Sequence, residues 1–243
     1  CQKMTHVQPN LSFEKPFTTV DIVIFSVQDN KLKVLLVKRP SNASEPYPNQ
    51  WALVGGFVDV QLDADLEATA RRKLFEKTHV KTAYLEQIGS WGNATRDPRG
   101  WSTTHVYFSM LAMNHAEQLK SGANAQDVQW FDVVENGVQT ALAFDHAHLL
   151  AVAIERLRNK VEYTSLPAFL MPTLFTLKEL QSTFEAVLAR PLERSAFRTR
   201  ILATDLLEAT PHFKTAANRP AQLYQLKSNL QPVYFQRTFN PIK

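Results

Sequence analysis

The hydrophobic pattern of the first 160 residues predicts short strands. Apolar positions over 17–25 predict a strand, the polar turn Gln28–Lys31 follows, and apolar positions return over 32–37, so a hairpin is expected. Further apolar runs of strand length begin at Trp51 or lie over 82–89, 106–112 and 128–131. The pattern therefore favours a mixed sheet.

Helical periodicity occupies two stretches between these strands. Four residues recur at helical spacing with charges between them and predict one apolar stripe: Leu66, Ala70, Leu74 and Phe75. A second helix is predicted over 149–157. Asp145 precedes it, and we expect this aspartate to cap the free backbone N–H groups of the helix. With the sheet, these helices predict an α/β/α sandwich.

The pattern changes near residue 161. Pro167 and Pro172 lie in an apolar stretch, and because a residue before proline avoids the helical conformation, we expect 162–172 to be an extended connector. The length of 243 residues allows one large domain or two smaller ones. We expect an N-terminal extension over 1–16, the sandwich domain over 17–160, and a second domain with its connector over 161–243.

Two helices and a hairpin are predicted after the connector. Thr176 and Glu179 form a capping box for a helix that reaches about Ala189. A second helix is predicted over 194–207, and two apolar stretches around a basic turn predict a hairpin over 207–226. This order predicts a winged helix-turn-helix domain, which makes the fold class α+β.

The charge is unevenly distributed along the chain. Residues 1–160 carry 17 basic and 17 acidic residues, whereas residues 161–243 carry 10 basic and 6 acidic residues. The whole excess thus lies in the predicted winged helix, which suggests a polyanionic partner such as DNA. A merely soluble basic domain fits the charge equally well.

The rest of the composition narrows the class of protein. A single cysteine, Cys1, excludes an internal disulfide framework and a cysteine-based zinc site. No window approaches the roughly 20 apolar residues that span a bilayer, and the first ten residues lack the apolar core of a secretory signal. We therefore expect a cytoplasmic protein with no membrane partner and no bound metal.

The stretch 51–80 resembles the Nudix box, in which a glycine turn precedes a helix with paired glutamates. Gly55-Gly56 provide the turn, and the helical part is matched by Arg72, Leu74, Glu76, Thr78 and Val80. Lys73 and Lys77 stand where the box has glutamates, and His79 replaces its closing glycine. Nudix hydrolases use these glutamates to hold divalent metals. The resemblance therefore implies a Nudix fold without catalytic residues or hydrolysis.

An ordinary amphipathic helix after a tight turn would show the same spacing. The segment 96–101, Arg-Asp-Pro-Arg-Gly-Trp, favours the Nudix resemblance, because it is similar to a segment of Nudix proteins that handle ADP-ribose.

The predicted winged helix carries basic and hydroxyl side chains at its second helix and hairpin tip. They are Arg194, Ser195, Arg198, Thr199, Arg200, Lys214 and Arg219. The early turns of a recognition helix reach bases and phosphates in the major groove, so we expect these residues to contact double-stranded DNA. Two helices joined by a tight turn are common in helical domains, but the basic charge favours DNA binding.

A Nudix-like domain followed by this winged helix resembles the NrtR-type Nudix-related transcriptional regulators. The resemblance rests on residues 55–58, 72–80, 96–101, 142–146 and 218–224. It implies a repressor of NAD metabolism genes that ADP-ribose releases from DNA, with no required cofactor. It also implies a homodimer on a palindromic operator with half-sites about one helical turn apart.

The resemblance points to residues for ADP-ribose. Because guanidinium and ammonium groups pair with phosphate oxygens, the candidates for the diphosphate are Arg39, Lys73, Arg96 and Arg99. Phe57 and Trp101 are candidates for stacking on adenine or packing on ribose, and a core role is the alternative for each. His146 is expected at the ligand or between the domains.

Two other functions stay open at this point. One is an active Nudix hydrolase of ADP-ribose or a related nucleoside diphosphate derivative, against which Lys73 and Lys77 argue. The other is a related regulator that senses a sugar, against which the arginines of the segment 96–99 argue. For a regulator, the connector is expected to carry the change in domain arrangement.

Overall fold

The structure, a computed structural model, describes residues 14–79, 84–112, 114, 128–215, 219–227 and 231–235. The N-terminal extension expected over 1–16 lies almost wholly outside these residues, as do the start of the strand predicted over 82–89 and the tip of the predicted hairpin. Within the described ranges, no helix combines the length and the apolar character needed to cross a bilayer.

The central element of the sheet is β1 (Phe17–Gln28). It pairs antiparallel with β2 (Lys31–Lys38) and β4 (Val54–Phe57), and parallel with β6 (Ser102–Met110), so the sheet is mixed. The β1–β2 turn has positive φ at Asp29 and Asn30, as a two-residue hairpin turn requires. The remaining strands of the sheet are β3 (Trp51–Ala52), β5 (Leu85–Asn93) and β7 (Val128–Asp132).

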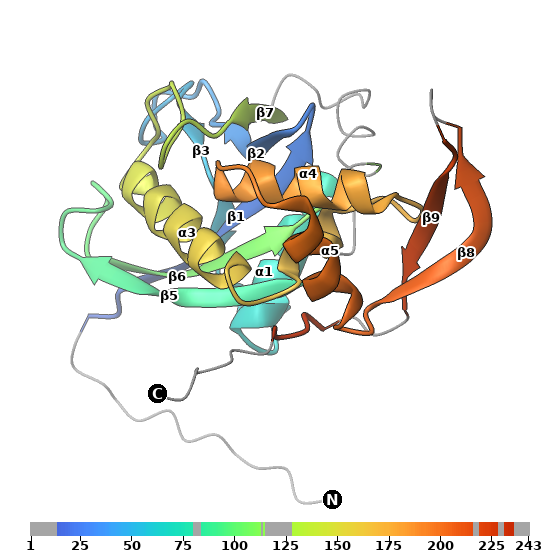
Figure 1. Ribbon diagram of the computed structural model, residues 1–243. Helices are drawn as coiled ribbons and strands as arrows, with labels where there is room; N and C mark the ends of the chain where they lie inside the picture. Colours follow the sequence, from blue (N-terminus) through green and yellow to red (C-terminus); the bar gives the residue numbers. More distant parts are fainter. Residues whose placement is uncertain are drawn as a thin grey trace, which may run out of the picture.

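The sheet lies between helices (Figure 1), and β1 carries buried apolar residues on both of its faces. Ile22 and Ile24 pack toward α1 (Leu66–Thr78), whereas Val23 and Phe25 belong to the core formed with α3 (His146–Val161). A strand that is buried on both faces needs a nearly continuous apolar run, and 17–28 supplies one. The predicted α/β/α sandwich is confirmed.

Capping residues define both ends of the helix α1. Asp65 accepts a hydrogen bond from the Ala68 N–H, and the helix stops at His79, whose φ of 54° is left-handed. The Nudix box has glycine at this position, and glycine adopts such a conformation without steric cost. The prediction that Phe75 is buried is wrong, because it is 44% exposed while Leu74 and Thr78 face the sheet.

The prediction of a turn at Gly55-Gly56 is also wrong, because both glycines lie in β4. A Cβ atom on Gly55 would lie 2.3 Å from the Val20 carbonyl oxygen and 2.4 Å from a carboxylate oxygen of Asp21. Glycine is therefore needed here for the close approach of β4 to β1.

The second domain has the predicted winged-helix order. The helices are α4 (Leu177–Leu188) and α5 (Arg194–Leu202), and the wing is the hairpin of β8 (Leu207–Lys214) and β9 (Ala221–Leu226). The Thr176–Glu179 capping box is present. The expected end of the second helix at 207 is wrong, since Asp205 has positive φ and lets the chain turn into β8.

The connector is not extended, contrary to the prediction. Residues Leu166–Leu170 form a short 3-10 helix, η1, with Pro167 in its first turn, where a missing N–H costs nothing. Leu166, Ala168 and Leu170 are buried in one apolar core that also holds α3, α4 and α5 residues. The two halves of the chain are thus joined by packed side chains.

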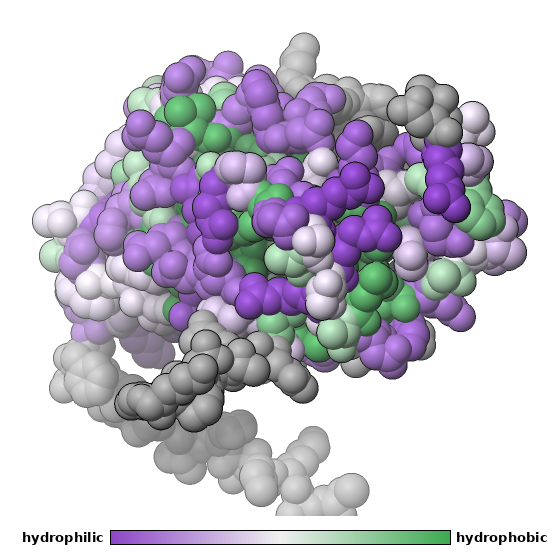
Figure 2. Space-filling view, viewed as in Figure 1, coloured by the Kyte–Doolittle hydropathy of each residue, from purple (hydrophilic) through white to green (hydrophobic). Residues whose placement is uncertain are grey.

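The face that carries α3, α4 and the wing is mostly hydrophilic. Figure 2 shows apolar residues on this face only in smaller areas between the polar ones. Most of the apolar residues of α3 and α4 are instead buried in the shared core.

We expect the substitution Gly55→Ala to lower the free energy of unfolding by about 1–3 kcal/mol, because the added methyl group overlaps the β1 backbone. Gly137→Ala is the matched control, since nothing lies within 4 Å of its Cβ position. Chemical denaturation of both variants measures the difference. Equal stability of the two variants would contradict the close β1–β4 contact.

Candidate functional site

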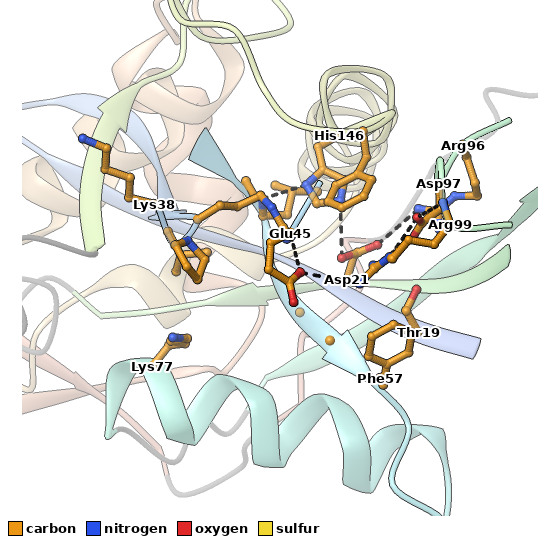
Figure 3. Close-up of a pocket in the computed structure, with 18 residues that line it drawn as sticks. Thr19, Asp21, Lys38, Glu45, Phe57, Lys77, Arg96, Asp97, Arg99 and His146 are labelled. Atoms are coloured by element: carbon orange, nitrogen blue, oxygen red, sulfur yellow. Dashed lines mark hydrogen bonds and ion pairs between the residues drawn. The ribbon is translucent and has the colours of Figure 1, made fainter. Parts of the chain in front are cut away.

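A cavity of about 290 Å³ opens at the end of the sheet between β1, β2, β4 and the first residue of α3. This volume is near the lower end of small-molecule sites, which begin at about 300 Å³. In Figure 3, Arg96, Asp97 and Arg99 lie on one side of the cavity, and Lys38 and Lys77 lie on the other. Its charged lining residues are Asp21, Lys38, Arg39, Glu45, Lys77, Arg96, Asp97 and Arg99. Basic residues outnumber acidic ones, which favours an anionic ligand.

Arg39 is held at the rim of the cavity by its own loop. Its Nε atom donates to the Pro46 carbonyl oxygen over 2.8 Å, and its Nη2 atom donates to Glu45 over 3.2 Å. The guanidinium carbon lies 4.8 Å from the centre of the Phe144 ring. Stacking and hydrogen bonds preorganise this group for an anion. Arg39, a candidate for the diphosphate, lines the cavity.

Arg99, which also lines the cavity, is fixed in a similar way. Its guanidinium bonds both carboxylate oxygens of Asp97, over 2.8 and 3.0 Å, and its carbon lies 5.1 Å from the centre of the Phe57 ring. Burial works to raise the pKa of Asp97, but the hydrogen bonds from Arg99 outweigh it and the pKa is lowered. Phe57 and Arg99 both line the cavity.

Arg96 also lines the cavity, but its guanidinium group is buried and paired with carboxylates. Its side chain is only 4% exposed, and its Nε and Nη2 atoms donate to the two carboxylate oxygens of Asp145 over 3.0 and 2.9 Å. Asp21 lies 3.5 Å from the same guanidinium and accepts a hydrogen bond from Thr104. Arg96 thus forms the cavity wall with its charge already balanced by carboxylates.

The prediction that the Asp145 side chain caps α3 needs correction. Asp145 is the residue before the helix, but its side chain makes no capping hydrogen bond. The bidentate pair with Arg96 uses both of its oxygens. A charged bidentate partner is stronger than a backbone amide, so the tertiary contact replaces the local cap.

His146 connects the cavity to the β3–β4 segment. Its Nδ1 atom accepts a hydrogen bond from the Leu53 N–H over 3.0 Å, and its Nε2 atom lies 3.5 Å from Asp21. An Nδ1 atom that accepts carries no proton, so the geometry assigns the proton to Nε2, facing Asp21. Burial lowers the pKa of His146 because it disfavours the charged ring. His146 is therefore a neutral residue of the cavity wall.

Two predicted effector residues lie outside the cavity lining. Trp101 is 51% exposed and its ring lies against Gly92. Lys73 bonds to Glu76 over 3.1 Å, and its aliphatic chain packs beside Gly56.

The sequence prediction missed several cavity residues. They are Thr19, Asp21, Lys38, Glu45, Lys77, Asp97 and Phe144. Lys77 was singled out for its place in the box, and Phe144 lies in the segment 142–146 that carries the family resemblance. Glu45 belongs to a proline-rich loop with no periodicity, so no local signal identifies it.

The donor groups of the box helix do not fit a metal site. Glu76 bonds to both Arg72 and Lys73, over 2.9 and 3.1 Å. Burial works to raise the pKa of Glu76, but these two hydrogen bonds outweigh it and the pKa is lowered. Asp63 is held bidentately by Arg72. In the described parts of the chain, no group of three or more histidine, cysteine or carboxylate side chains is arranged to hold a metal ion.

A second hollow, of about 860 Å³, lies between α4, α5 and the wing. Arg194, Arg198 and Arg219 line it together, although Arg219 is distant from the other two in sequence. None of the three forms an ion pair within the residues that the structure describes. Three arginines without acidic partners on one groove suit a phosphate backbone.

The other predicted DNA contacts are placed differently. Lys214 pairs with Glu179, Ser195 donates its hydroxyl group to Glu193, and Thr199 is exposed on α5. Arg200 lies over the Phe235 ring, with 5.2 Å between the guanidinium carbon and the ring centre. The structure therefore separates Arg200 from the arginines of the groove.

The chain is similar to proteins of known architecture. Residues 16–153 match the NUDIX domain family, and residues 167–226 match the family described as the NrtR DNA-binding winged helix domain. Over 213 residues the chain is 45% identical to the ADPR responsive transcriptional repressor NtrR of Acinetobacter baylyi, covering 88% of this chain and 83% of the relative.

Solved structures extend the similarity to three dimensions. Shewanella oneidensis NrtR complexed with a 27mer DNA has 41% sequence identity and a TM-score of 0.82, over 92% of this chain and 99% of that one. The NUDIX domain of Shewanella oneidensis NrtR complexed with ADP ribose has 40% identity and a TM-score of 0.52, over 62% of this chain and 94% of that one.

We expect His146 to make stability fall as the pH falls. Because its pKa is lowered in the folded state, the unfolded chain takes up a proton below about pH 6.5 while the folded chain resists it. The free energy of unfolding should therefore fall by at most about 1.4 kcal/mol per pH unit. His146→Asn keeps an acceptor for the Leu53 N–H but cannot titrate, so denaturation at pH 7.5 and 5.5 should show a smaller loss. His148→Gln, on an exposed residue of α3, is the control and should retain the wild-type loss.

Proposed function

The chain belongs to the NrtR family, and from this we propose that it is a transcriptional repressor that binds operator DNA and is released by ADP-ribose. The observation that carries the proposal is the presence, on one folded chain, of two basic sites. One is the enclosed cavity with Arg39 and Arg99 on its rim, and the other is the open groove with Arg194, Arg198 and Arg219. The relatives are named as an ADP-ribose-responsive repressor and as a protein complexed with DNA, which supports both assignments.

The effector cavity suits a diphosphate between nucleoside and ribose groups. Arg39 and Arg99 both line it, each stacked on an aromatic ring, and Lys38 and Lys77 add positive charge. Phosphate oxygens would compete with Glu45, which lies 3.2 Å from Arg39 and 3.6 Å from Arg99. Displacement of this carboxylate would free both guanidinium groups for the ligand.

The helix α3 gives a physical route from the cavity to the winged helix. Its N-terminal end carries Asp145 and His146, which contact the cavity network. Near its C-terminal end, Arg158 donates to the Val187 carbonyl oxygen of α4 over 3.1 Å, and Glu162 pairs with Arg190. A ligand that moves the first turn of α3 would therefore move α4, and its differential affinity for the two arrangements sets the size of the response.

This route replaces the hinge that the sequence suggested in the connector. Residues Leu166–Leu170 are packed in the shared core, so a bend there would expose apolar side chains. A shift of packed helices requires less exposure.

We further propose that the cavity binds ADP-ribose without hydrolysing it. Glu76 is neutralised by Arg72 and Lys73, and Lys77 places an ammonium group at the cavity. These groups oppose the metal cations that phosphate hydrolysis by a Nudix site requires. The target genes in NAD metabolism, the homodimer and the palindromic operator are proposals that follow from the family resemblance.

We expect the chain to bind DNA from upstream of NAD metabolism genes and to leave it when ADP-ribose is added with magnesium present. Fluorescence anisotropy of labelled DNA measures the release, and chromatography of the same sample measures AMP. Release with intact ADP-ribose is the expected result.

Each departure from this result has a separate meaning. Formation of AMP would contradict the loss of hydrolysis and favour an active enzyme. If ADP-ribose leaves DNA binding unchanged and a sugar such as free ribose abolishes it, the effector is a sugar and not ADP-ribose. Absence of DNA binding at low salt would overturn the repressor function itself.

We expect Arg99→Gln to raise the ADP-ribose concentration needed for release roughly tenfold or more, because one charged hydrogen-bond donor to the ligand is lost. Binding to DNA without effector should stay unchanged, since Arg99 is remote from the groove residues. Arg71→Gln removes an equal charge from the exposed face of α1, outside the cavity lining, and is the control. A wild-type response of the Arg99 variant would exclude this residue from the effector site.

A further inference from the structure

The segment Val233–Phe235 follows the wing and lies along the connector. The Ser165 N–H donates to the Val233 carbonyl oxygen over 2.9 Å, and the Val233 N–H donates to the Ser165 hydroxyl oxygen over 2.8 Å. Two residues further along the segment, the Phe235 N–H donates to the Tyr163 carbonyl oxygen over 2.9 Å. These hydrogen bonds and an isolated β-bridge between Thr164 and Tyr234 hold the segment against the residues that join α3 to η1.

Phe235 extends this attachment to both helices of the winged helix. Its side chain is 8% exposed and belongs to the shared core. Its ring centre lies 6.4 Å from that of Phe184 on α4, and the Arg200 guanidinium of α5 covers the ring at 5.2 Å. Phe235 thus contacts the connector through its backbone, and α4 and α5 through its side chain.

Arg198 and Arg200 point to different sides of α5. Two residues apart on a helix means a rotation of about 200°, so the two side chains face nearly opposite directions. Arg198 lines the groove with Arg194 and Arg219, whereas Arg200 is directed to Phe235. The basic residues of α5 therefore divide between the groove and the exposed Arg200 that covers the Phe235 ring.

We propose that Val233–Phe235 is a C-terminal strap that fixes the orientation of α5 for DNA, and that Arg200 is a positioning residue for the strap, with no contact to DNA. The inference rests on the proposed DNA binding. It follows from the geometry, because the cation–π contact between Arg200 and Phe235 ties α5 to the segment that is itself hydrogen-bonded to Tyr163 and Ser165. Loss of the tie leaves α5 anchored mainly by Phe197 and Ile201.

The salt dependence of DNA binding separates a positioning residue from a phosphate contact. The logarithm of the affinity falls with the logarithm of the salt concentration, with a slope of about −0.9 for each phosphate neutralised. We expect Arg198→Gln to make the slope shallower by about 0.9. Arg200→Gln should weaken binding roughly two- to five-fold at every salt concentration while the slope stays at the wild-type value.

Phe235 variants test the same contact from the other side. Phe235→Leu keeps apolar volume in the core but removes the ring face, so it should reproduce the loss seen for Arg200→Gln. In the double variant the two losses should not add, because each removes the same contact. Phe235→Ala also removes core packing, so amide hydrogen exchange of α5 should be faster in this variant than in Phe235→Leu.

Two results would overturn the strap. A shallower slope for Arg200→Gln, like that of Arg198→Gln, would make Arg200 a direct phosphate contact. Full wild-type affinity in both the Arg200→Gln and Phe235→Leu proteins would remove any role in orienting α5. Failure of the wild-type protein to bind DNA would refute the proposed function alone, since exchange of α5 in the Phe235 variants still tests whether the strap holds the helix.

Discussion

The buried Arg96 guanidinium is the interaction on which the arrangement of the site depends. It joins Asp21 of β1 to Asp145 at the start of α3, and its side chain is nearly inaccessible to solvent. Removal of one partner of a buried ion pair generally costs about 3–5 kcal/mol, because the other charge is left without compensation. The pair therefore fixes the sheet and α3 relative to each other at the cavity floor, and His146 adds a neutral contact to the same carboxylate of Asp21.

The position of α3 in turn determines how the two halves of the chain communicate. Its apolar face is shared between the sheet and the winged helix, since one continuous core contains β1, α3, η1, α4 and α5 residues. A helix that is displaced in a packed interior displaces its neighbours too, because close-packed side chains leave little free volume. A local change at the first turn of α3 would therefore displace α4, whose capping box and Phe175–Tyr224 bridge hold the start of the helix against the wing.

The basic side chains of this fold lie in three different surroundings. In the cavity, the arginines are preorganised by carboxylates and aromatic rings, so a small anionic ligand meets groups already in place. On the groove, Arg194, Arg198 and Arg219 form no ion pairs within the described residues and lie open to a long polyanion. The box helix shows a third arrangement, in which Arg72 and Lys73 neutralise Glu76 and leave no carboxylate free for a cation.

The sequence by itself determined the elements that depend on local pattern: the β1–β2 hairpin, the helix α1, the capped α4, the winged-helix order and the family resemblance. Three of the residues that it suggested for the effector, Arg39, Phe57 and Arg99, line the same cavity. Only the tertiary structure decided the partners of Arg96, Asp145 and Arg200, because each is bound by a residue more than 30 positions away. Periodicity and propensity describe neighbours along the chain, whereas these side chains choose the strongest charged or aromatic partner that folding brings within reach.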